Sequence, residues 1–399
     1  MNTPRRIALV EFSPSGGLFQ FAVQLGEALA AQGHRVVLYT GPRPELTSGH
    51  PGLTIAGVLP TWHPLDARQR GPLVRKARRL VRAGQLVLAW LVLLVRLRAR
   101  RPDALFFSTW RFGIDALGVL ATDRLLPTTM LGIVSHEPRP MRAADTTSMR
   151  RGPVLDRALP AAWQRMDVIF VLGEETRRIL VETWHPKAPV FVIPHGDEAA
   201  LRGGGPLPAV AETAPVALFF GLWTAYKGID VLLDAWPEVR AAVPAATLVI
   251  AGAPGVMDPD EVLRSARVAG GVDVRAGYVD RDEIPGLFGA ARVVVTPYVR
   301  ASQSGVAHLA FTFDRPVVAT TVGDIPKVVQ EGVSGLLVPP RDAAALAEAL
   351  IALLSDADRA ARLGAAGGEW LRREASWETV AERVIEGLTS AATTSGMPN

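Results

Sequence analysis

The sequence of 399 residues contains no cysteine and carries a formal net charge of only +4. Without cysteine the chain has neither disulfides nor thiolate metal ligands, which fits a reducing compartment. The small net charge argues against a nucleic-acid partner. The N-terminal sequence, MNTPRRIALVEF, lacks the long apolar segment of a signal peptide, so we expect a cytoplasmic protein.

Uncharged apolar runs are short, and none reaches the roughly 18 residues that a membrane-spanning helix needs. One such run, from Ala83 to Val95, is flanked on both sides by basic residues and by no acidic ones. This pattern predicts a helix that lies on the anionic inner surface of a membrane. The alternative is a core helix whose ends are solvated. The membrane contacts expected are Arg75, Lys76, Arg78, Arg79, Arg82, Trp90, Arg96 and Arg98.

Hydrophobic residues make up 49% of the chain, and short β-branched runs alternate with helical periodicity. This alternation predicts an α/β fold of doubly wound parallel sheets, and the length indicates two such domains facing a cleft. We predict a first domain at 1–200, a Gly-, Pro- and Ala-rich linker at 201–214 and a second domain at 215–375. A last helix at 376–390 would cross back to the first domain.

The first domain begins with a strand, 7–12, that leads into a turn containing Gly16 and Gly17. Ligands of doubly wound sheets bind at the carboxyl ends of the strands, where this turn lies. Helix-capping glycines are the alternative interpretation. The GxGxxG pattern is absent, so the turn does not predict a dinucleotide. His136 follows a later strand at the same end of the sheet and is either a substrate contact or a structural histidine.

Two turns in the second domain predict an anion site. After an apolar strand at 293–296, small polar residues lead through Ser304 and Gly305 into a helix, whose free N–H groups would face an anion. A plain strand-to-helix turn is the alternative. Lys227 enters another helix near its N-terminus, where a cation is unfavourable unless an anion lies beside it.

Separated motifs in a fixed order carry a family resemblance. They are GHRVVLYT after the glycine turn, SHEPRP, VIPHG, FFGLWTAYKGIDVLLDAW, LVIAG, AGYVDRDEIPGLFGAARVVVTPY and RPVVATTVGDIPKVVQEGVSGLLVPP. They cover most of the chain, which resembles the family 4 retaining glycosyltransferases with the GT-B fold. The resemblance implies a metal-independent, hexosyltransferase-type enzyme that needs no cofactor besides its nucleotide-diphosphate sugar. It also implies two catalytic residues: Lys227, which holds the donor diphosphate, and His136, which lies on the acceptor side. The donor-binding positions implied are Gly16, Gly17, Gly221, Thr224, Lys227, Tyr278, Gln303, Ser304, Gly305, Val306 and His308.

The chain departs from the family pattern at two glutamates and an arginine. The glutamates that often contact the sugar and the ribose fall on Ala301 and Leu309, and the arginine falls near Thr224. Gln303 or His308 would substitute for the glutamates, in a branch of the family with a serine-glutamine-serine turn.

The acceptor implied is a hydroxyl of a glycan, and the basic apolar helix favours a lipid-linked or cell-envelope glycan, such as an exopolysaccharide precursor. The alternative function is a non-catalytic subunit of the same fold that binds a sugar nucleotide or a partner transferase at the membrane. A third is a sugar-nucleotide epimerase or hydrolase. Retention of Lys227 and of the Ser304-Gly305 turn favours an active transferase.

Overall fold

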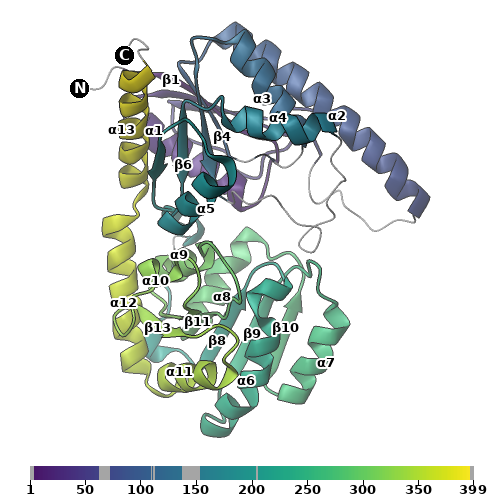
Figure 1. Ribbon diagram of the computed structural model, residues 1–399. Coiled ribbons are helices and arrows are strands. Elements are labelled where there is room, and N and C mark those ends of the chain that lie inside the picture. The colour runs from purple at the N-terminus through teal and green to yellow at the C-terminus, as the bar shows by residue number, and fades with distance from the viewer. Residues whose placement is uncertain are drawn as a thin grey trace. The chain divides into compact units, whose positions relative to one another are not determined.

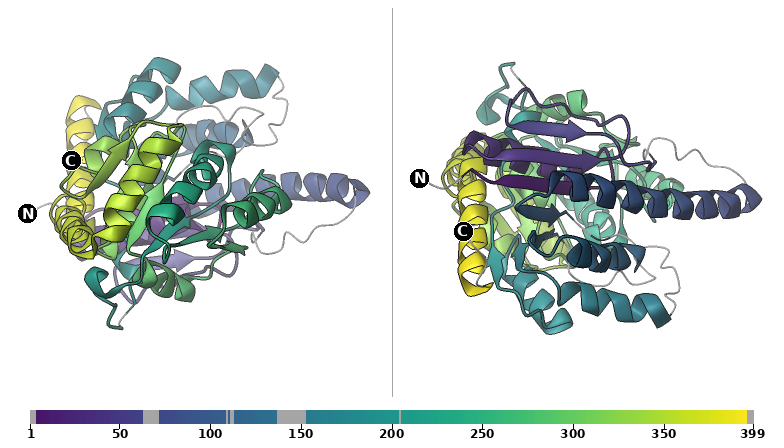
Figure 2. Two further views of the ribbon diagram at one scale, coloured as in Figure 1. Left: turned by 90° about the horizontal axis from the view of Figure 1, so that it is seen from below. Right: turned by 90° about the horizontal axis from the view of Figure 1, so that it is seen from above.

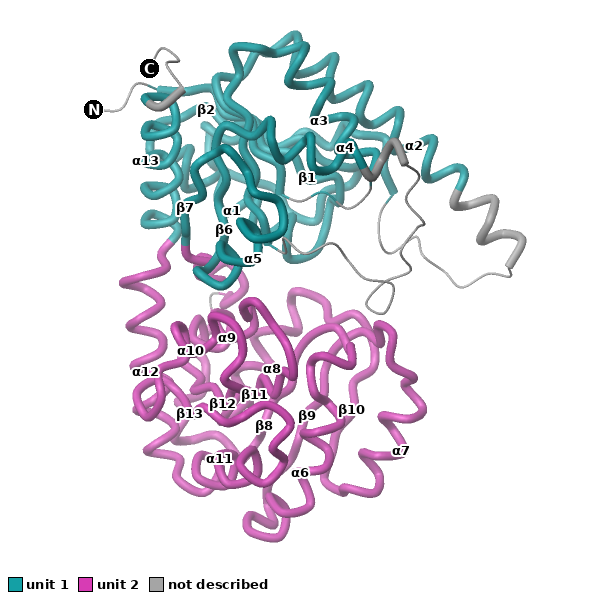
Figure 3. Tube along the Cα trace, in the orientation of Figure 1, with its two compact units in different colours: residues 1–139, 149–193, 377–399 teal, residues 140–148, 194–376 magenta. Residues whose placement is uncertain are grey.

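The computed structural model describes residues 4–62, 72–108, 110, 113–136, 153–203 and 205–395. It divides into two compact units, each built on a parallel sheet (Figures 1 and 3). Unit 1 comprises Met1–Arg139, Met149–Ile193 and Trp377–Asn399. Unit 2 contains Pro194–Ser376. The predicted α/β class with two doubly wound parallel sheets is therefore confirmed.

Unit 1 has seven strands in the order β3-β2-β1-β4-β5-β6-β7. The strands are β1 (Arg6–Glu11), β2 (Arg35–Thr40), β3 (Leu53–Ala56), β4 (Ala104–Phe107), β5 (Met130–Ser135), β6 (Val168–Val171) and β7 (Val190–Val192). The helices are α1 (Gly17–Ala31), α2 (Pro72–Arg100), α3 (Gly113–Leu125), α4 (Pro153–Trp163), α5 (Glu174–Trp184) and α13 (Trp377–Ser395). Alternate residues of β1 enter different cores: Ile7 and Leu9 on one face, Ala8 and Val10 on the other. Both faces are therefore covered, as a parallel sheet requires.

Unit 2 has six strands in the order β10-β9-β8-β11-β12-β13. The strands are β8 (Val216–Phe220), β9 (Thr247–Gly252), β10 (Val272–Ala276), β11 (Val293–Thr296), β12 (Val317–Thr320) and β13 (Gly335–Val338). The helices are α6 (Ile229–Ala242), α7 (Pro259–Ala269), α8 (Ile284–Ala290), α9 (Gly305–Thr312), α10 (Ile325–Val328), α11 (Ala343–Ser355) and α12 (Ala357–Glu374). The 3-10 helices are η2 (Ala199–Leu201), η3 (Val210–Glu212), η4 (Ala225–Lys227) and η5 (Arg281–Glu283).

The C-terminal helix packs in unit 1, as predicted. Val380, Val384 and Leu388 of α13 are fully buried in the same core cluster as Leu25 and Leu29 of α1. The spacing of these residues, four apart on α13, places them on one helical face. α13 and α1 are neighbours in Figure 1.

The segment predicted as a linker, 201–214, belongs to unit 2 instead. Leu201 and Val210 are buried in its two core clusters, and the carbonyl of Pro208 accepts a hydrogen bond from Arg315. The chain passes between the units at residues 193–194 and 376–377. Only isolated side chains anchor residues 201–214, so the segment shows no periodic apolar pattern. Its Gly-, Pro- and Ala-rich composition therefore resembles that of a linker.

Candidate functional site

The turn between β8 and α6 carries Lys227. Gly228, which follows it, has a φ of 68°, in the left-handed region that favours glycine. A Cβ atom on Gly228 would lie 2.0 Å from the carbonyl oxygen of Pro297, so no larger residue fits. The N–H of Val299 donates to the carbonyl of Tyr226 at 2.7 Å. These contacts hold the turn against the segment that follows β11.

The side chain of Lys227 folds back inside unit 2. A Cβ atom on Gly221 would lie 2.7 Å from its Nζ, which also lies 5.5 Å from the ring centroid of Tyr298. Burial lowers the pKa of Lys227, and no described carboxylate forms an ion pair with it. The buried hydroxyl of Thr224 likewise has no hydrogen-bond partner among the described residues. A desolvated cation without a counterion indicates a site for an anion.

The N-terminus of α9 offers backbone donors to such an anion. Ser304 caps the helix, because its hydroxyl accepts a hydrogen bond from the N–H of Ala307 at 3.3 Å. The N–H groups of Gly305 and Val306 donate to no described residue. Tyr298 links this turn to Lys227, because the tyrosine is hydrogen-bonded to Ser304; burial raises the pKa of Tyr298 to about 12. The structure therefore brings together the predicted Lys227, Ser304, Gly305 and Val306.

Gln303 lies one residue before the cap and is partly buried. Its Oε1 is buried without a hydrogen-bond partner in the described part of the chain. An amide oxygen in that state is costly unless a ligand or water donates to it. Gln303 and His308 were predicted to replace the family's glutamates. The Oε1 atom of Gln303 is available to accept a hydrogen bond from a ligand.

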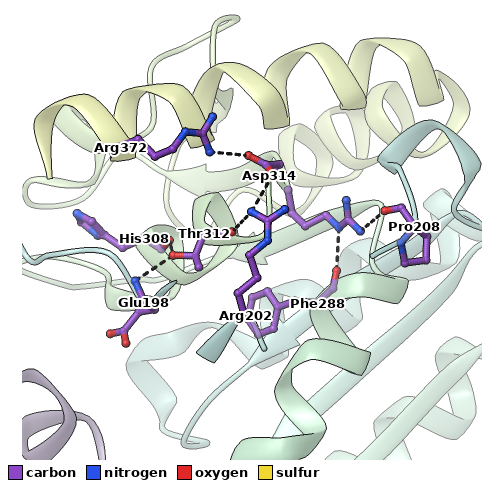
Figure 4. Close-up of polar contacts among 9 residues, drawn as sticks. Glu198, Arg202, Pro208, Phe288, His308, Thr312, Asp314 and Arg372 are labelled. Carbon is purple, nitrogen blue, oxygen red and sulfur yellow. Dashed lines mark hydrogen bonds and ion pairs between the residues drawn. The ribbon is translucent and has the colours of Figure 1, made fainter. Parts of the chain in front are cut away.

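His308 supports the turn from inside instead of facing a ligand. Its side chain is 3% exposed, its Nδ1 lies 3.2 Å from the carbonyl oxygen of Ser304, and its ring lies 5.2 Å from that of His195. Burial lowers the pKa of His308 to about 4, so the ring is neutral and Nδ1 donates. Thr312 continues the network: it donates to the carbonyl of His308 and accepts from the N–H of Glu198 (Figure 4). The predicted donor contact of His308 is thus corrected to a positioning contact.

The glycine turn of unit 1 is partly occupied by a carboxylate. Gly16 has a φ of 89°, and its N–H donates to Oε2 of Glu45 at 2.9 Å. The N–H of Gly17 donates to no described residue. A Cβ atom on either glycine would meet nothing within 4 Å. Gly17 is therefore open to a ligand, whereas the N–H predicted at Gly16 is already in use.

His136 lies in unit 1 at the carboxyl end of β5. Its ring meets Phe21 edge-on, with 4.7 Å between the centroids. Burial lowers the pKa of His136 to about 4. A neutral imidazole accepts or donates a hydrogen bond but supplies no charge near neutral pH. The catalytic role of His136 stays a prediction, and it would have to be that of a neutral hydrogen-bonding group.

The pKa values of His308 and His136 predict a pH dependence of stability. Both histidines bind a proton near pH 6.5 when unfolded but only near pH 4 when folded, so their stabilisation is complete above pH 6.5 and is lost as the pH falls to about 4. We expect the free energy of unfolding to fall by about 2–3 kcal/mol per histidine between pH 7.5 and 4.5. Urea unfolding of wild type and His308→Gln tests this. The pH-dependent fall in the free energy of unfolding should be smaller in the variant by the contribution of one histidine. An identical pH dependence in the two proteins would contradict the lowered pKa of His308.

A pocket of about 530 Å³ lies at the carboxyl end of β10. It contains the predicted Tyr278, whose side chain is 53% exposed, together with the adjoining Gly277 and Val279. The sequence did not single out two charged residues that also line it, Arg275 and Glu283. Tyr298, beside Lys227, was missed as well. In the sequence, Tyr298 could have been recognised as a site residue only from its position directly after Pro297, which ends a strand.

The two places of the family's glutamates hold no polar side chain. Leu309 is 5% exposed and belongs to a core cluster of unit 2, and Ala301 is half-buried. A carboxylate at 309 would be buried among apolar groups. Within the described residues, no three His, Asp or Glu side chains come together as metal ligands.

Helix α2 has two apolar sides. One side packs in a core of unit 1 and includes Trp90, which is 4% exposed and donates from Nε1 to Asp115 at 2.9 Å. The predicted membrane contact of Trp90 is therefore wrong, because this ring lies in the core. By length and composition alone, Leu80–Arg100 is long and apolar enough to cross a membrane, with a mean hydropathy of 1.8. Its packed side argues against crossing, since core contacts would be lost.

The other side of α2 is an exposed apolar stripe. It consists of Leu80, Val87, Leu88, Leu91 and Val95, spaced so that they share one helical face. Figure 2, viewed from above, shows α2 in the foreground, in front of the sheet of unit 1. Arg96 and Arg98 are exposed, whereas Arg82 lies over the ring of Trp62 at 4.8 Å. The predicted contacts Arg75, Lys76, Arg78 and Arg79 have side chains outside the described residues.

Comparison with known proteins agrees with this architecture. Residues 15–198 match the family described as Glycosyltransferase Family 4, and residues 214–356 match Glycosyl transferases group 1. The chain is 30% identical over 254 residues to a GDP-mannose-dependent alpha-(1-6)-phosphatidylinositol monomannoside mannosyltransferase of Mycobacterium tuberculosis, a match that covers 59% of this chain and 65% of that relative. The chain thus spans less than two thirds of this relative.

Two further similarities extend over nearly the whole chain. A phosphatidyl-myo-inositol mannosyltransferase of Mycobacterium leprae is 26% identical over 394 residues, 96% of this chain and 95% of that protein. The solved structure of sucrose-phosphate synthase from Thermosynechococcus elongatus superposes with a TM-score of 0.72 at 22% identity, covering 98% and 100% of the two chains. The family matches in both halves, on two Rossmann-like sheets, show that the chain belongs to the family 4 glycosyltransferases with the GT-B fold.

Proposed function

We propose that the protein is a retaining, metal-independent glycosyltransferase that moves a sugar from a nucleotide-diphosphate sugar to a hydroxyl acceptor. The observation that carries this proposal is the anion site of unit 2. Lys227, a cation without a described counterion, is linked through Tyr298 to the unused N–H groups at the start of α9. A diphosphate has the charge and the acceptor oxygens that both groups need.

The same groups supply the chemistry that the reaction requires. When the bond between the anomeric carbon and the diphosphate breaks, negative charge develops on the leaving oxygen. Lys227 and the N–H groups of Gly305 and Val306, which donate to no described residue, would stabilise that charge. The acceptor oxygen bonds to the anomeric carbon from the face that the diphosphate leaves, and its proton passes to a diphosphate oxygen. Gln303 Oε1 would accept a hydrogen bond from a sugar hydroxyl.

For the acceptor we propose a lipid-linked glycan at the inner surface of the membrane. The mycobacterial relatives are named as a phosphatidylinositol monomannoside mannosyltransferase and a phosphatidyl-myo-inositol mannosyltransferase. In this chain the exposed apolar stripe of α2 would enter the headgroup region, and Arg96 and Arg98 would contact anionic lipids.

The assay of function is transfer from a panel of nucleotide sugars to lipid-linked and soluble glycan acceptors. We expect product with one nucleotide, unaffected by a metal chelator, with the donor's anomeric configuration retained by NMR. Inversion of configuration would contradict the retaining mechanism. Nucleotide binding without transfer to any acceptor would favour a non-catalytic subunit.

The membrane contact is tested separately by sedimentation with anionic vesicles. Leu91→Gln with Val95→Gln should weaken binding about tenfold or more, because two exposed apolar side chains lose their burial in lipid. Val268→Gln, at an exposed valine of α7, is the control and should bind like wild type. Binding should also fall with salt. Equal binding to neutral vesicles would remove the electrostatic part of the proposal.

A further inference from the structure

The buried ring of Tyr298 lies beside the ammonium group of the anion site in unit 2. We propose that Tyr298 is a positioning residue, whose ring holds Lys227 where the diphosphate binds without neutralising its charge. This inference rests on the proposed function, because it explains how the cation of that site is kept in place. Tyr298 acts through Lys227 and not through the donor itself.

The ammonium group of Lys227 lies between backbone and an aromatic face. Its Nζ lies over the ring of Tyr298, 5.5 Å from the centroid, and a Cβ atom on Gly221 would come within 2.7 Å of the same Nζ. A cation within about 6 Å of an aromatic face is attracted by the electrons of the ring, more strongly where water is excluded. Tyr298 is 3% exposed, so its ring provides such an attraction.

An aromatic ring suits this task better than a carboxylate does. A carboxylate beside Lys227 would hold the ammonium group but would also cancel its charge, so that an anionic ligand would be attracted less. Within the described residues no carboxylate forms an ion pair with Lys227. The ring of Tyr298 carries no net charge, and it therefore leaves the positive charge of Lys227 to the ligand.

The position of the ring is fixed by contacts along the whole residue. The hydroxyl of Tyr298 is hydrogen-bonded to Ser304, which caps α9, and its carbonyl accepts a hydrogen bond from the hydroxyl of Thr320 at 2.6 Å. The N–H of the next residue, Val299, donates to the carbonyl of Tyr226 in η4 at 2.7 Å. The ring, the start of α9 and the turn that carries the lysine are thus held to one another.

The ring determines how often Lys227 is in place before a ligand binds. Lysine has a flexible four-carbon side chain, and burial disfavours its charge, so the ammonium group favours solvent. Attraction to the ring of Tyr298 opposes this tendency and raises the fraction of molecules whose ammonium group lies at the anion site. The apparent affinity for a diphosphate rises with that fraction. A weaker attraction should therefore weaken nucleotide binding.

The test varies the electrons of the ring while its shape is kept. Tyr298 is replaced by phenylalanine and by phenylalanines with one, two or three ring fluorines, which withdraw electrons from the face of the ring. Binding of UDP, GDP and ADP to the full chain is measured by calorimetry, and thermal melts verify the fold of each protein. Relative to Tyr298→Phe, three fluorines should weaken the tightest-binding nucleotide about 3- to 10-fold, and fewer fluorines should weaken it less.

Two controls separate positioning from packing. In Lys227→Met the same series should change the affinity less than about twofold, because no cation lies over the ring. Trifluorination at Phe313, a ring of the same core cluster that stacks on Phe288, should leave nucleotide binding unchanged.

Equal affinities along the series at position 298, or the same losses in Lys227→Met, would overturn the positioning role of Tyr298 while leaving the anion site intact. Failure of all three nucleotides to bind wild type would instead remove the proposed function, and this role with it.

Discussion

Lys227→Met should lower the rate of sugar transfer by about 10²- to 10³-fold, the usual effect of removing one preorganised group that stabilises a developing negative charge. Its effect on stability should have the opposite sign. Burial lowers the pKa of Lys227, and no described carboxylate offsets the cost of its charge, so methionine should leave the melting temperature unchanged or higher.

A lower transfer rate together with an unchanged or higher melting temperature would show that Lys227 has a functional role and not a structural one. Arg267→Met, at an exposed cation of α7, is the matched control and should change neither property. Steady-state kinetics and thermal melts on the same preparations suffice for both comparisons. Transfer at the wild-type rate by Lys227→Met, or a large loss of its stability, would contradict the assigned role.

Arg315→Met should destabilise unit 2 by about 3–5 kcal/mol, among the largest effects expected in the chain. Arg315 is 2% exposed and donates to the backbone carbonyls of Pro208, Phe288 and Gly289, each at 2.8 Å. Methionine would leave three carbonyl oxygens without this donor. The bond to Pro208 also holds the segment before β8 against α8.

Arg372→Met is the control for this experiment. Its guanidinium pairs with Asp314 at 3.2 Å but is 62% exposed, so the ion pair contributes at most about 1 kcal/mol. Urea unfolding should therefore separate the two variants clearly. Equal losses in both would show that the buried carbonyl contacts of Arg315 are not the source of stability.

Much of the fold could be predicted because its periodic segments are strong. The strand, glycine turn and helix at the N-terminus lie where the pattern placed them, and Ile229, Leu232 and Trp236 of α6 are buried as their spacing indicates. Segments held by single side chains could not be predicted. Leu201 and Val210 anchor residues 201–214 within unit 2, yet two isolated apolar residues produce no period.

Some residues of the candidate site could likewise be predicted from the sequence, and others could not. Lys227 and the Ser304-Gly305 turn were recognisable because their chemistry follows from local position. The burial of Trp90 could not be recognised from the sequence. The apolar residues of α2 lie on two opposite sides of one helix, so they form a continuous apolar run in the sequence. His308 is likewise polar in sequence but enclosed by tertiary packing, which raises the cost of charging it.

Thermal melting of wild type and Lys227→Met with saturating nucleoside diphosphates tests most directly whether unit 2 holds a donor diphosphate at Lys227. At a hundredfold excess over the dissociation constant, one nucleotide should raise the melting temperature of wild type by about 5 °C or more. The shift should be much smaller at the same concentration in Lys227→Met, because a charged contact to the diphosphate is missing. Equal shifts in both proteins, or no shift with any nucleotide, would contradict a diphosphate site at Lys227.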